Sequence, residues 1–459
     1  MPQLIIIIIY FAVMLAIGVA SRKKAGQADD FFVAGRKGSS LFIVGSLLAT
    51  IIGGSATVGM AGLGFQRGLT GAWWMLAGSI GLICLGLFFA RKVRKFALYT
   101  LPELIEKQYD RRMALASSVL IVIAWIAIIA AQIIAAGKIM GILGMGTPTL
   151  WMVIFSFVFI AYTVLGGQYS VIRTDFFQAV IIFGGIFTGL GLLLSRLGGW
   201  DGLQSHLSPD MFAFPVSSQF GGADLLSLLL VVGLTYVVGP DMYSRIFCAR
   251  DDATARASAL WTALLIIPVA FAITLLGMGA AVLFPGIAPD QALPMIISEI
   301  FSPLVGGIVL AALLCAVMSS ADTTLLSAST ILTVDIIGGF RSSPDRKNVL
   351  PRSRWLIILL GIVALVVALL LQNIISALLF AYTVYTCGVI LPVIAGFFKD
   401  RLKVTAAGAL AALIGGGAAG IASKLISIKY LDLGALALSA VLLFLVSFID
   451  KRLKNKIPR

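Results

Sequence analysis

A cluster of polar residues interrupts one strongly apolar stretch of the chain. At helical spacing, i, i+3, i+4 and i+7 share one face, and these positions hold Ala316, Ser319, Ser320 and Thr323. Asp322 lies beside that face. A carboxylate near the centre of a bilayer costs roughly 2.5–3.5 kcal/mol, which favours a partner cation or a proton. The pattern indicates an ion site, although hydroxyls in membrane helices can also bond to their own helix and allow close packing.

The surrounding sequence is that of a polytopic membrane protein. The chain has 459 residues, of which 60% are hydrophobic and only 12% are charged. Apolar stretches of about 20 residues predict transmembrane helices. They number thirteen, near residues 3–21, 39–65, 70–90, 113–142, 148–166, 174–195, 224–247, 257–285, 300–337, 354–372, 374–398, 404–427 and 432–450.

The net charge of +14 is distributed unevenly between the predicted loops. With an external N-terminus, only five of the 34 Lys and Arg residues fall on the outer side, namely Arg67, Lys138, Arg196, Lys424 and Lys429. The inner side receives the rest, including residues 22–24, 91–95, the 341–354 loop and the 451–459 tail. Positive residues concentrate on the cytoplasmic side. We therefore expect a multi-pass protein of the inner or plasma membrane, N-terminus outside and C-terminus cytoplasmic, without a nucleic-acid partner.

Two of the predicted helices contain breaks. Residues 51–59 include Gly53 and Gly54, and residues 233–240 end in Gly239 and Pro240. Glycine and proline weaken a helix, and backbone groups freed within a membrane must line a cavity or be buried in protein. Close packing of helices is an alternative reason for the glycines.

The breaks are five helices apart, which predicts two inverted five-helix repeats around a midplane site. The corresponding divisions are a peripheral helix and inner loop (1–38), a first repeat (39–196), an external loop (197–223), a second repeat (224–398), and two peripheral helices with a basic tail (399–459).

Four segments form a recognisable set of motifs. Residues 166–178 begin with two glycines and contain Thr-Asp-x-x-Gln, and residues 316–335 contain the paired serines and a second hydroxyl-rich segment. Residues 46–54 form the first break, and residues 101–103 read Leu-Pro-Glu. Together they resemble the motifs of the sodium/solute symporter family over much of the chain.

The resemblance implies the inverted-repeat (5+5) fold of the bacterial leucine transporter, an all-α membrane architecture, and symport driven by Na⁺. It also implies a principal sodium site. Its ligands would be the main-chain carbonyls of Ala49, Ile52 and Ala316 and the hydroxyls of Ser319 and Ser320. Sodium is a hard cation that prefers such oxygen ligands.

Some members of the family have a second sodium site. Its positions here correspond to Asp175, Ser319, Asp322 and Thr323. The family commonly has a small hydroxyl or apolar residue where this chain has Asp322. Three interpretations therefore stay open for Asp322: a second sodium ligand, a protonatable group, or an ion-pair partner of Arg173.

A substrate pocket is expected beside the two breaks. Polar and aromatic residues there make a plausible pocket for a small molecule, although each could instead serve helix packing or an interfacial aromatic belt. The candidates are Ser55, Ala56, Thr57, Trp73, Trp74, Gln132, Thr235, Tyr236, Tyr382, Tyr385 and Thr386. None is basic, which disfavours a strongly anionic substrate.

The combined prediction is a secondary transporter that carries a small organic solute, such as an amino acid, monocarboxylate or sugar, into the cell with sodium by alternating access. The alternatives are proton coupling through Asp322 or Asp175, and a transporter-like sensor. An enzyme is not expected, because the single histidine, His206, lies in an external loop without catalytic partners.

Overall fold

The computed structural model describes residues 2–22, 26–141, 144, 146–338, 349–371, 373–426 and 428–456. Within these ranges the chain is helical and has no β-strand; its only β-type pairing is two isolated bridges. The predicted all-α class is therefore confirmed. Part of the basic inner segments, residues 23–25, 341–348 and 457–459, lies outside the described residues.

Eleven helices or helix assemblies are long and apolar enough to cross a membrane. Seven are single helices: α1 (Pro2–Ser21), α8 (Arg111–Gly141), α9 (Pro148–Leu197), α14 (Asp252–Leu283), α17 (Val349–Leu370), α21 (Ala406–Ile426) and α22 (Leu431–Lys456). Four are assemblies of shorter segments: η2 (Ser55–Gly59) to α6 (Ala90–Lys95), α11 (Gly222–Leu228) to α13 (Pro240–Cys248), α16 (Pro303–Ile331) with η8 (Leu332–Ile337), and α18 (Ile374–Tyr385) to α19 (Leu391–Gly396).

Thirteen transmembrane helices were predicted, and the eleven candidate segments do not confirm that number. Two of them are much longer than a bilayer requires: α9 has 50 residues and the Ser55–Lys95 segment has 41. A helix rises about 1.5 Å per residue, so about 20 residues cross the hydrocarbon core. Each long segment also contains a glycine with positive φ, Gly167 at 54° and Gly68 at 64°. Each is therefore long enough for two crossings.

The helix assemblies contain several shorter elements, and further short helices lie between the spans. Those between Ser55 and Lys95 are α4 (Met60–Arg67), η3 (Gly68–Ala72), α5 (Trp73–Cys84) and η4 (Leu85–Phe89); those after Leu228 are η6 (Leu229–Gly233) and α12 (Leu234–Val237); η9 (Thr386–Ile390) precedes α19. The remaining short helices are α2 (Ala28–Val33), η1 (Ala34–Arg36), α3 (Ser40–Ile51), α7 (Leu101–Gln108), α10 (Gly199–His206), η5 (Pro209–Phe212), η7 (Pro289–Gln291), α15 (Ala292–Ile300) and α20 (Lys399–Leu402).

Local capping signals fix several of the helix ends. Thr100 begins α7 with a capping box, in which its hydroxyl accepts from the Glu103 amide at 3.2 Å and the Glu103 carboxylate accepts from the Thr100 amide at 3.2 Å. Asp251 begins α14 by accepting from the Thr254 amide at 2.7 Å. This hydrogen bond lowers the pKa of the Asp251 carboxyl.

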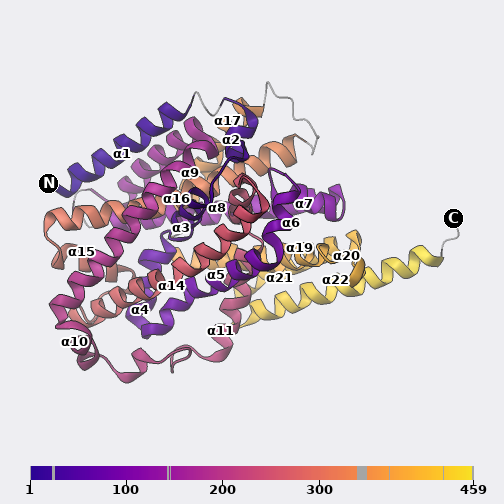
Figure 1. Ribbon diagram of the computed structural model, residues 1–459. Coiled ribbons are helices and arrows are strands. Elements are labelled where there is room, and N and C mark those ends of the chain that lie inside the picture. Colours follow the sequence, from indigo (N-terminus) through magenta and orange to yellow (C-terminus); the bar gives the residue numbers. More distant parts are fainter. Residues whose placement is uncertain are drawn as a thin grey trace.

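Helix α16 lies at the centre of the bundle, between α1, α3, α8, α9 and α17 (Figure 1). All residues from Val309 to Ile331 are buried, including the hydroxyl-bearing ones. Several of those hydroxyls donate to carbonyls of their own helix, for example Thr324 to Ser320 at 2.6 Å and Thr330 to Leu326 at 2.7 Å. Polar groups can therefore be buried here without losing hydrogen bonds.

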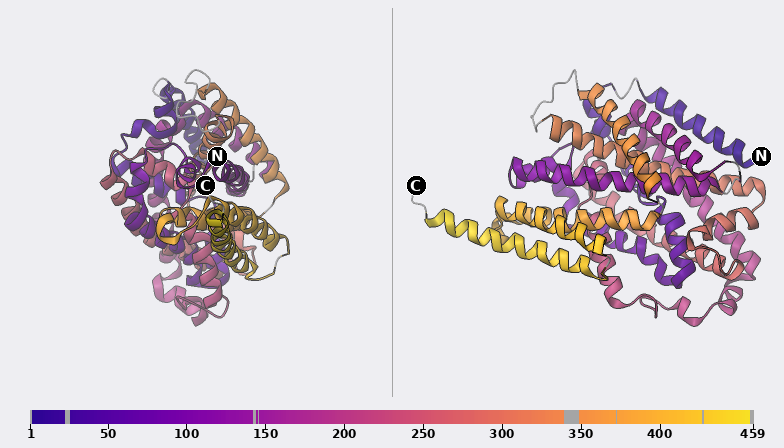
Figure 2. Two further views of the ribbon diagram at one scale, coloured as in Figure 1. Left: turned by 90° about the vertical axis from the view of Figure 1, so that its right-hand side faces the viewer. Right: turned by 180° about the vertical axis from the view of Figure 1, so that it is seen from behind.

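The last two helices pack together at one edge of the bundle. Helix α22 lies along α21, and its C-terminal end projects beyond the other helices (Figure 2). The start of α1 and the end of α22 lie at opposite ends of the bundle, measured along the helices (Figure 2). Helix α22 contributes none of its described residues to the space between the two helix breaks.

The close approach of α14 to α4 predicts a strong sensitivity to volume at Gly277. A Cβ atom there would lie 1.9 Å from the Ala61 carbonyl oxygen, so the helices would have to separate. We expect Gly277→Ala to lower the midpoint of thermal unfolding in detergent by several degrees. Gly184→Ala on α9, whose Cβ would meet no atom within 4 Å, is the control and should leave the midpoint nearly unchanged. Equal stability of the two variants would contradict this packing.

Candidate functional site

The first helix break separates α3 from η2. Helix α3 ends at Ile51, and Ile52 has φ −82° and ψ 62°, outside the helical range. The Gln132 side chain of α8 reaches into this gap, where its Oε1 accepts from the Gly54 amide at 2.8 Å. A side chain from another helix thus satisfies a backbone group that the break leaves without a helical partner.

The second break separates α12 from α13. Val238 has φ −136° and ψ 58°, Gly239 is extended, and Pro240 occupies the first position of α13. The Tyr385 hydroxyl donates to the Val238 carbonyl. Both breaks are therefore stabilised from outside their own helices, the first by α8 and the second by α18.

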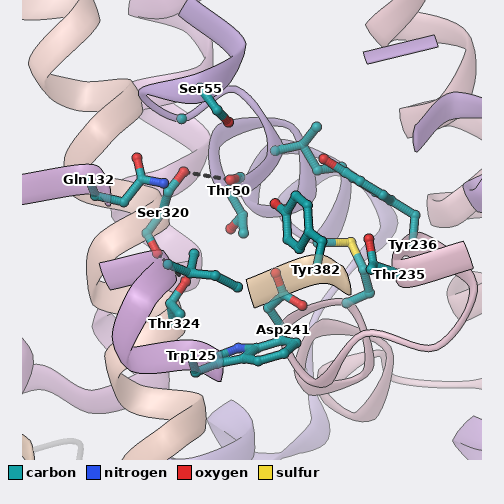
Figure 3. A pocket seen from close by; sticks show the side chains of 14 residues that line it. Thr50, Ser55, Trp125, Gln132, Thr235, Tyr236, Asp241, Ser320, Thr324 and Tyr382 are labelled. Carbon is teal, nitrogen blue, oxygen red and sulfur yellow. Dashed lines mark hydrogen bonds between the residues drawn. The ribbon is translucent and has the colours of Figure 1, made fainter. Parts of the chain in front are cut away.

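The paired serines of α16 face the end of α3. The Ser319 hydroxyl donates to the carbonyls of Ala49 at 2.6 Å and Ala316 at 3.0 Å. The Ser320 hydroxyl donates to the carbonyls of Thr50 at 2.5 Å and Ala316 at 3.1 Å (Figure 3). Because a hydroxyl can rotate and turn its lone pairs outward, these buried oxygens could coordinate a cation. Ile52, the fifth residue of the predicted site, follows directly after α3 and is fully buried.

The hydroxyl and carbonyl oxygens around Ser319 and Ser320 are of the kinds that bind an alkali cation. Among the described residues no group of three or more His, Cys, Asp or Glu side chains could hold a metal ion. A transition metal would prefer nitrogen or sulfur ligands, whereas hydroxyl and carbonyl oxygens suit hard cations.

An ion pair lies close to this oxygen cluster. Arg245 of α13 and Asp175 of α9 are both fully buried, and the guanidinium lies 3.2 Å from the Asp175 carboxylate. Ser46 joins the pair, since its hydroxyl accepts from Arg245 Nε at 3.0 Å and donates to Asp175 at 2.5 Å. Arg245 also donates to the Thr323 hydroxyl. A buried charge is tolerated only when it is paired and hydrogen-bonded, and here Arg245 and Asp175 pair with each other and bond to neighbouring hydroxyls, while Asp175 Oδ1 has no hydrogen-bond partner.

Asp322 is the third charged residue of this region. It is fully buried, and its Oδ1 accepts from the Thr323 hydroxyl at 3.3 Å while its Oδ2 has no hydrogen-bond partner. The guanidinium here belongs to Arg245, whereas Arg173 stacks over the Tyr169 ring at 4.3 Å. Of the predicted second-site residues, Asp175 and Thr323 contact Arg245, and Asp322 keeps an oxygen without a partner.

A buried cavity lies between the breaks. Figure 3 shows Ser55, Gln132, Ser320 and Thr324 on one side and Asp241, Thr235, Tyr236 and Tyr382 on the other. The complete lining consists of Thr50, Ile51, Gly53, Ser55, Trp125, Ile128, Gln132, Thr235, Tyr236, Asp241, Met242, Ser320, Thr324 and Tyr382. Five of the predicted pocket residues are in it: Ser55, Gln132, Thr235, Tyr236 and Tyr382.

The other predicted pocket residues lie outside this lining. Trp73 donates to the Pro215 carbonyl at 2.8 Å and stacks on Phe214. The Tyr385 hydroxyl is held at the second break, and Thr386 donates to the Val231 carbonyl at 2.8 Å. The remaining three, Ala56, Thr57 and Trp74, are buried without lining the cavity.

Arg245, Asp241 and Trp125 are among the site residues that were not predicted from the sequence. Arg245 and Asp241 are charged residues within a predicted membrane span, which is by itself a signal of function. Both follow directly after the second break, at positions one and five after Pro240. Trp125 of α8 gave no signal, because an aromatic residue in an apolar helix has no distinguishing pattern.

Comparison with known proteins agrees with this geometry. The model of the sodium:solute symporter family matches residues 31–416, which is most of the chain. The chain belongs to the sodium:solute symporter family. The match includes both breaks, the paired serines and the Asp175 motif.

Individual members of the family are similar over nearly the whole chain. The sodium/glucose cotransporter of Vibrio parahaemolyticus is 27% identical over 90% of this chain and 83% of its own length. The high-affinity proline transporter PutP of Bacillus subtilis (strain 168) is 27% identical over 88% of each chain.

Solved structures place the fold among sodium-coupled symporters with the leucine-transporter architecture. A Na⁺-coupled sialic acid symporter in a substrate-bound, outward-open state has a TM-score of 0.84 at 18% identity, covering 99% of this chain and 98% of that one. Mhp1, a nucleobase-cation-symport-1 family transporter, has a TM-score of 0.63 at 14% identity, covering 92% and 94%. At these identities the similarity establishes the fold alone.

The family motif around Asp175 joins three helices. Gly167, with φ 54°, turns the chain within α9 where a side chain would collide with Phe31. The Gln178 amide donates to the Tyr10 hydroxyl of α1 at 3.0 Å, and that hydroxyl donates to Met318 Sδ of α16 at 3.3 Å. The motif thus holds Asp175 next to the paired serines.

The buried ion pair predicts strongly non-additive effects on stability. Removing one partner leaves a buried charge unpaired, which typically costs about 3–5 kcal/mol. We expect Arg245→Gln to lower the thermal unfolding midpoint more than Asp175→Asn, because Asp322 remains near the guanidinium in the second variant. The double variant should be more stable than the sum of the two single effects implies.

Thermal unfolding of the four proteins in detergent, wild type included, measures this coupling. Additive effects of the two substitutions would show that Arg245 and Asp175 do not depend on each other.

Proposed function

We propose that this protein is a symporter that couples the entry of sodium to the uptake of a small organic solute by alternating access. The observation that supports this most directly is the meeting of Ser319 with the Ala49 and Ala316 carbonyls, at 2.6 and 3.0 Å, next to a cavity between two broken helices. Ser320 belongs both to this oxygen cluster and to the cavity lining. An ion and a solute bound there would share the α3 and α16 surfaces.

The energy for uptake comes from the sodium gradient. Each sodium entering a negatively charged cell gains about 2.3 kcal/mol per 100 mV, in addition to its concentration gradient. Sodium at the ends of α3 and α16 would stabilise the conformation in which these helices meet, and binding of a solute to the same conformation would then be favoured.

A further coupling cation is proposed at Asp322. The Asp175 and Arg245 charges compensate each other, so Asp322 is the carboxylate of this group without a partner charge in contact. A second sodium or a proton at Asp322 would neutralise it. Proton coupling is thus the second candidate for the driving ion, and it rests on the free Asp322 Oδ2.

The transported solute is proposed to be small and organic. Relatives named for glucose and for proline indicate a sugar or an amino acid as the first candidates. The cavity lining has no Lys or Arg, which disfavours a strongly anionic solute such as a phosphate ester.

The arrangement in the membrane is proposed from charge. Basic residues predict an external N-terminus and a cytoplasmic C-terminus, in keeping with the positions of the two ends at opposite ends of the bundle (Figure 2). The proposed repeats, 39–196 and 224–398, each begin with a broken helix, and both breaks contribute to the cavity.

The proposed sodium site predicts that Ser319→Ala and Ser320→Ala each raise the sodium concentration required for half-maximal activation by roughly tenfold, because each removes one oxygen ligand. Ser329→Ala is the matched control: Ser329 is buried on the same helix, but its hydroxyl donates only to its own helix, at Leu326. Sodium activation of solute-dependent thermal stabilisation or of uptake into proteoliposomes measures the effect. Unchanged activation in both serine variants would refute this site.

Asp322→Asn separates the candidate roles of this residue. If it binds a second sodium, the Hill coefficient for sodium should fall toward one; if it binds a proton, pH dependence should disappear while the sodium response remains. A purely structural role predicts lower stability with an unchanged sodium response. Asp335→Asn, which removes another buried acid on the continuation of α16, should alter neither response. Sodium and pH activation in proteoliposomes distinguish these outcomes, and wild-type behaviour in both would exclude a coupling role.

A further inference from the structure

The cavity between the breaks has one charged side chain in its lining, and that side chain is acidic. Asp241 is the second residue of α13 and lies across the cavity from Ser55 and Gln132 (Figure 3). Twelve of the fourteen lining residues are buried, and the two exceptions are Asp241 and Tyr382. The carboxylate of Asp241 therefore faces the open part of the cavity, where a solute would contact it.

No ion pair neutralises this carboxylate among the described residues, since Asp241 takes part in none of theirs. Arg245 is one helical turn away on the same helix, but its guanidinium contacts Asp175, Ser46, Ser244 and Thr323. A carboxylate that a bound solute shields from water is costly unless a cation accompanies it.

Aromatic residues surround the same part of the cavity. Tyr236, Tyr382 and Trp125 line it, and Trp125 is held edge-on against Tyr385 with ring centroids 4.9 Å apart. The faces of such rings attract ammonium groups, most strongly when these are desolvated. Trp125 Nε1 is buried without a hydrogen-bond partner, so an acceptor group on the bound solute could satisfy it.

We propose that the transported solute carries an ammonium group, as an amine, an amino acid or a quaternary ammonium compound, which binds to Asp241 between these aromatic rings. This inference rests on the proposed function, because it assigns the solute of that transporter. With this arrangement, Asp241 would select ammonium compounds over neutral sugars and over simple monocarboxylates. A sugar could also donate hydroxyl hydrogen bonds to Asp241, but it would leave the charge of the carboxylate uncompensated.

Asp241 has an alternative structural role at the start of α13, because acidic residues in the first turn favour a helix N-terminus. Asn has nearly the shape of Asp but no charge, so Asp241→Asn removes the interaction with the helix dipole as well as the attraction for a cationic solute. The two roles are separated by what is measured. Loss of the dipole interaction alone would lower stability without changing which solutes bind.

The experiment uses the full-length protein in detergent with sodium and measures ligand-induced thermal stabilisation. The probes are matched pairs: proline and cyclopentanecarboxylate, in which carbon replaces nitrogen, and choline and its neutral carbon analogue. Methylamine, glucose and lactate complete the set. Asp201→Asn, an exposed acid on α10, is the control variant.

We expect at least one ammonium compound to stabilise the wild type while its carbon analogue, glucose and lactate do not. Asp241→Asn should weaken that binding by roughly ten- to a hundredfold, with little change in the midpoint without ligand, and Asp201→Asn should bind as the wild type does. Stabilisation by glucose, lactate or a carbon analogue alone, binding of no ammonium compound, or unchanged binding by Asp241→Asn would overturn the inference.

Repeating the measurement without sodium keeps this inference separate from the proposed function. If ammonium compounds bind selectively and equally well with and without sodium, sodium coupling would be contradicted but the role of Asp241 would remain. Sodium-dependent binding of glucose would retain sodium coupling and exclude the ammonium solute.

Discussion

The architecture depends on satisfying backbone groups at two helix breaks inside the membrane. Lipid offers no hydrogen bonds, so the amides and carbonyls at residues 52–54 and 238–239 that lack a helical partner must find one within the protein or in a cavity. Gln132 supplies one for the first break and Tyr385 one for the second. These side chains fix α8 and α18 against the broken helices, and the cavity lies in the space that the breaks create between them.

The same constraint explains why the proposed ion and solute sites adjoin. The last carbonyls of α3 have no following helical turn to accept from, and Ser319 and Ser320 contact them from α16. Both serines thus belong to a cluster of oxygens suited to a hard cation, and Ser320 also lines the cavity. A movement of α3 relative to α16 would change both at once, which is the physical requirement for coupled transport.

Charge imposes a second constraint on the core. Asp175 and Arg245 come from helices far apart in the sequence, yet neither could be buried in this position alone. Their pairing joins α9 to α13. Asp322 and Asp241 are acidic residues left outside that pair, and neither forms an ion pair among the described residues, so additional positive charge can be accommodated beside each.

The sequence alone determined the class of the protein. The length of the apolar stretches identified the membrane helices, and Gly53-Gly54 and Gly239-Pro240 located both breaks. The motif residues led to the family. These signals are local, because they arise from hydrophobicity and backbone conformation. Only the tertiary structure decided which side chains meet. Ion-pair partners and cavity linings depend on the rotation of each helix about its axis, which sequence spacing within one helix does not specify. Arg173, a predicted partner of Asp322, therefore lies over Tyr169, and the arginine of the core ion pair is Arg245. Asp241 and Trp125 likewise line a cavity from which Trp73 and Tyr385 are absent.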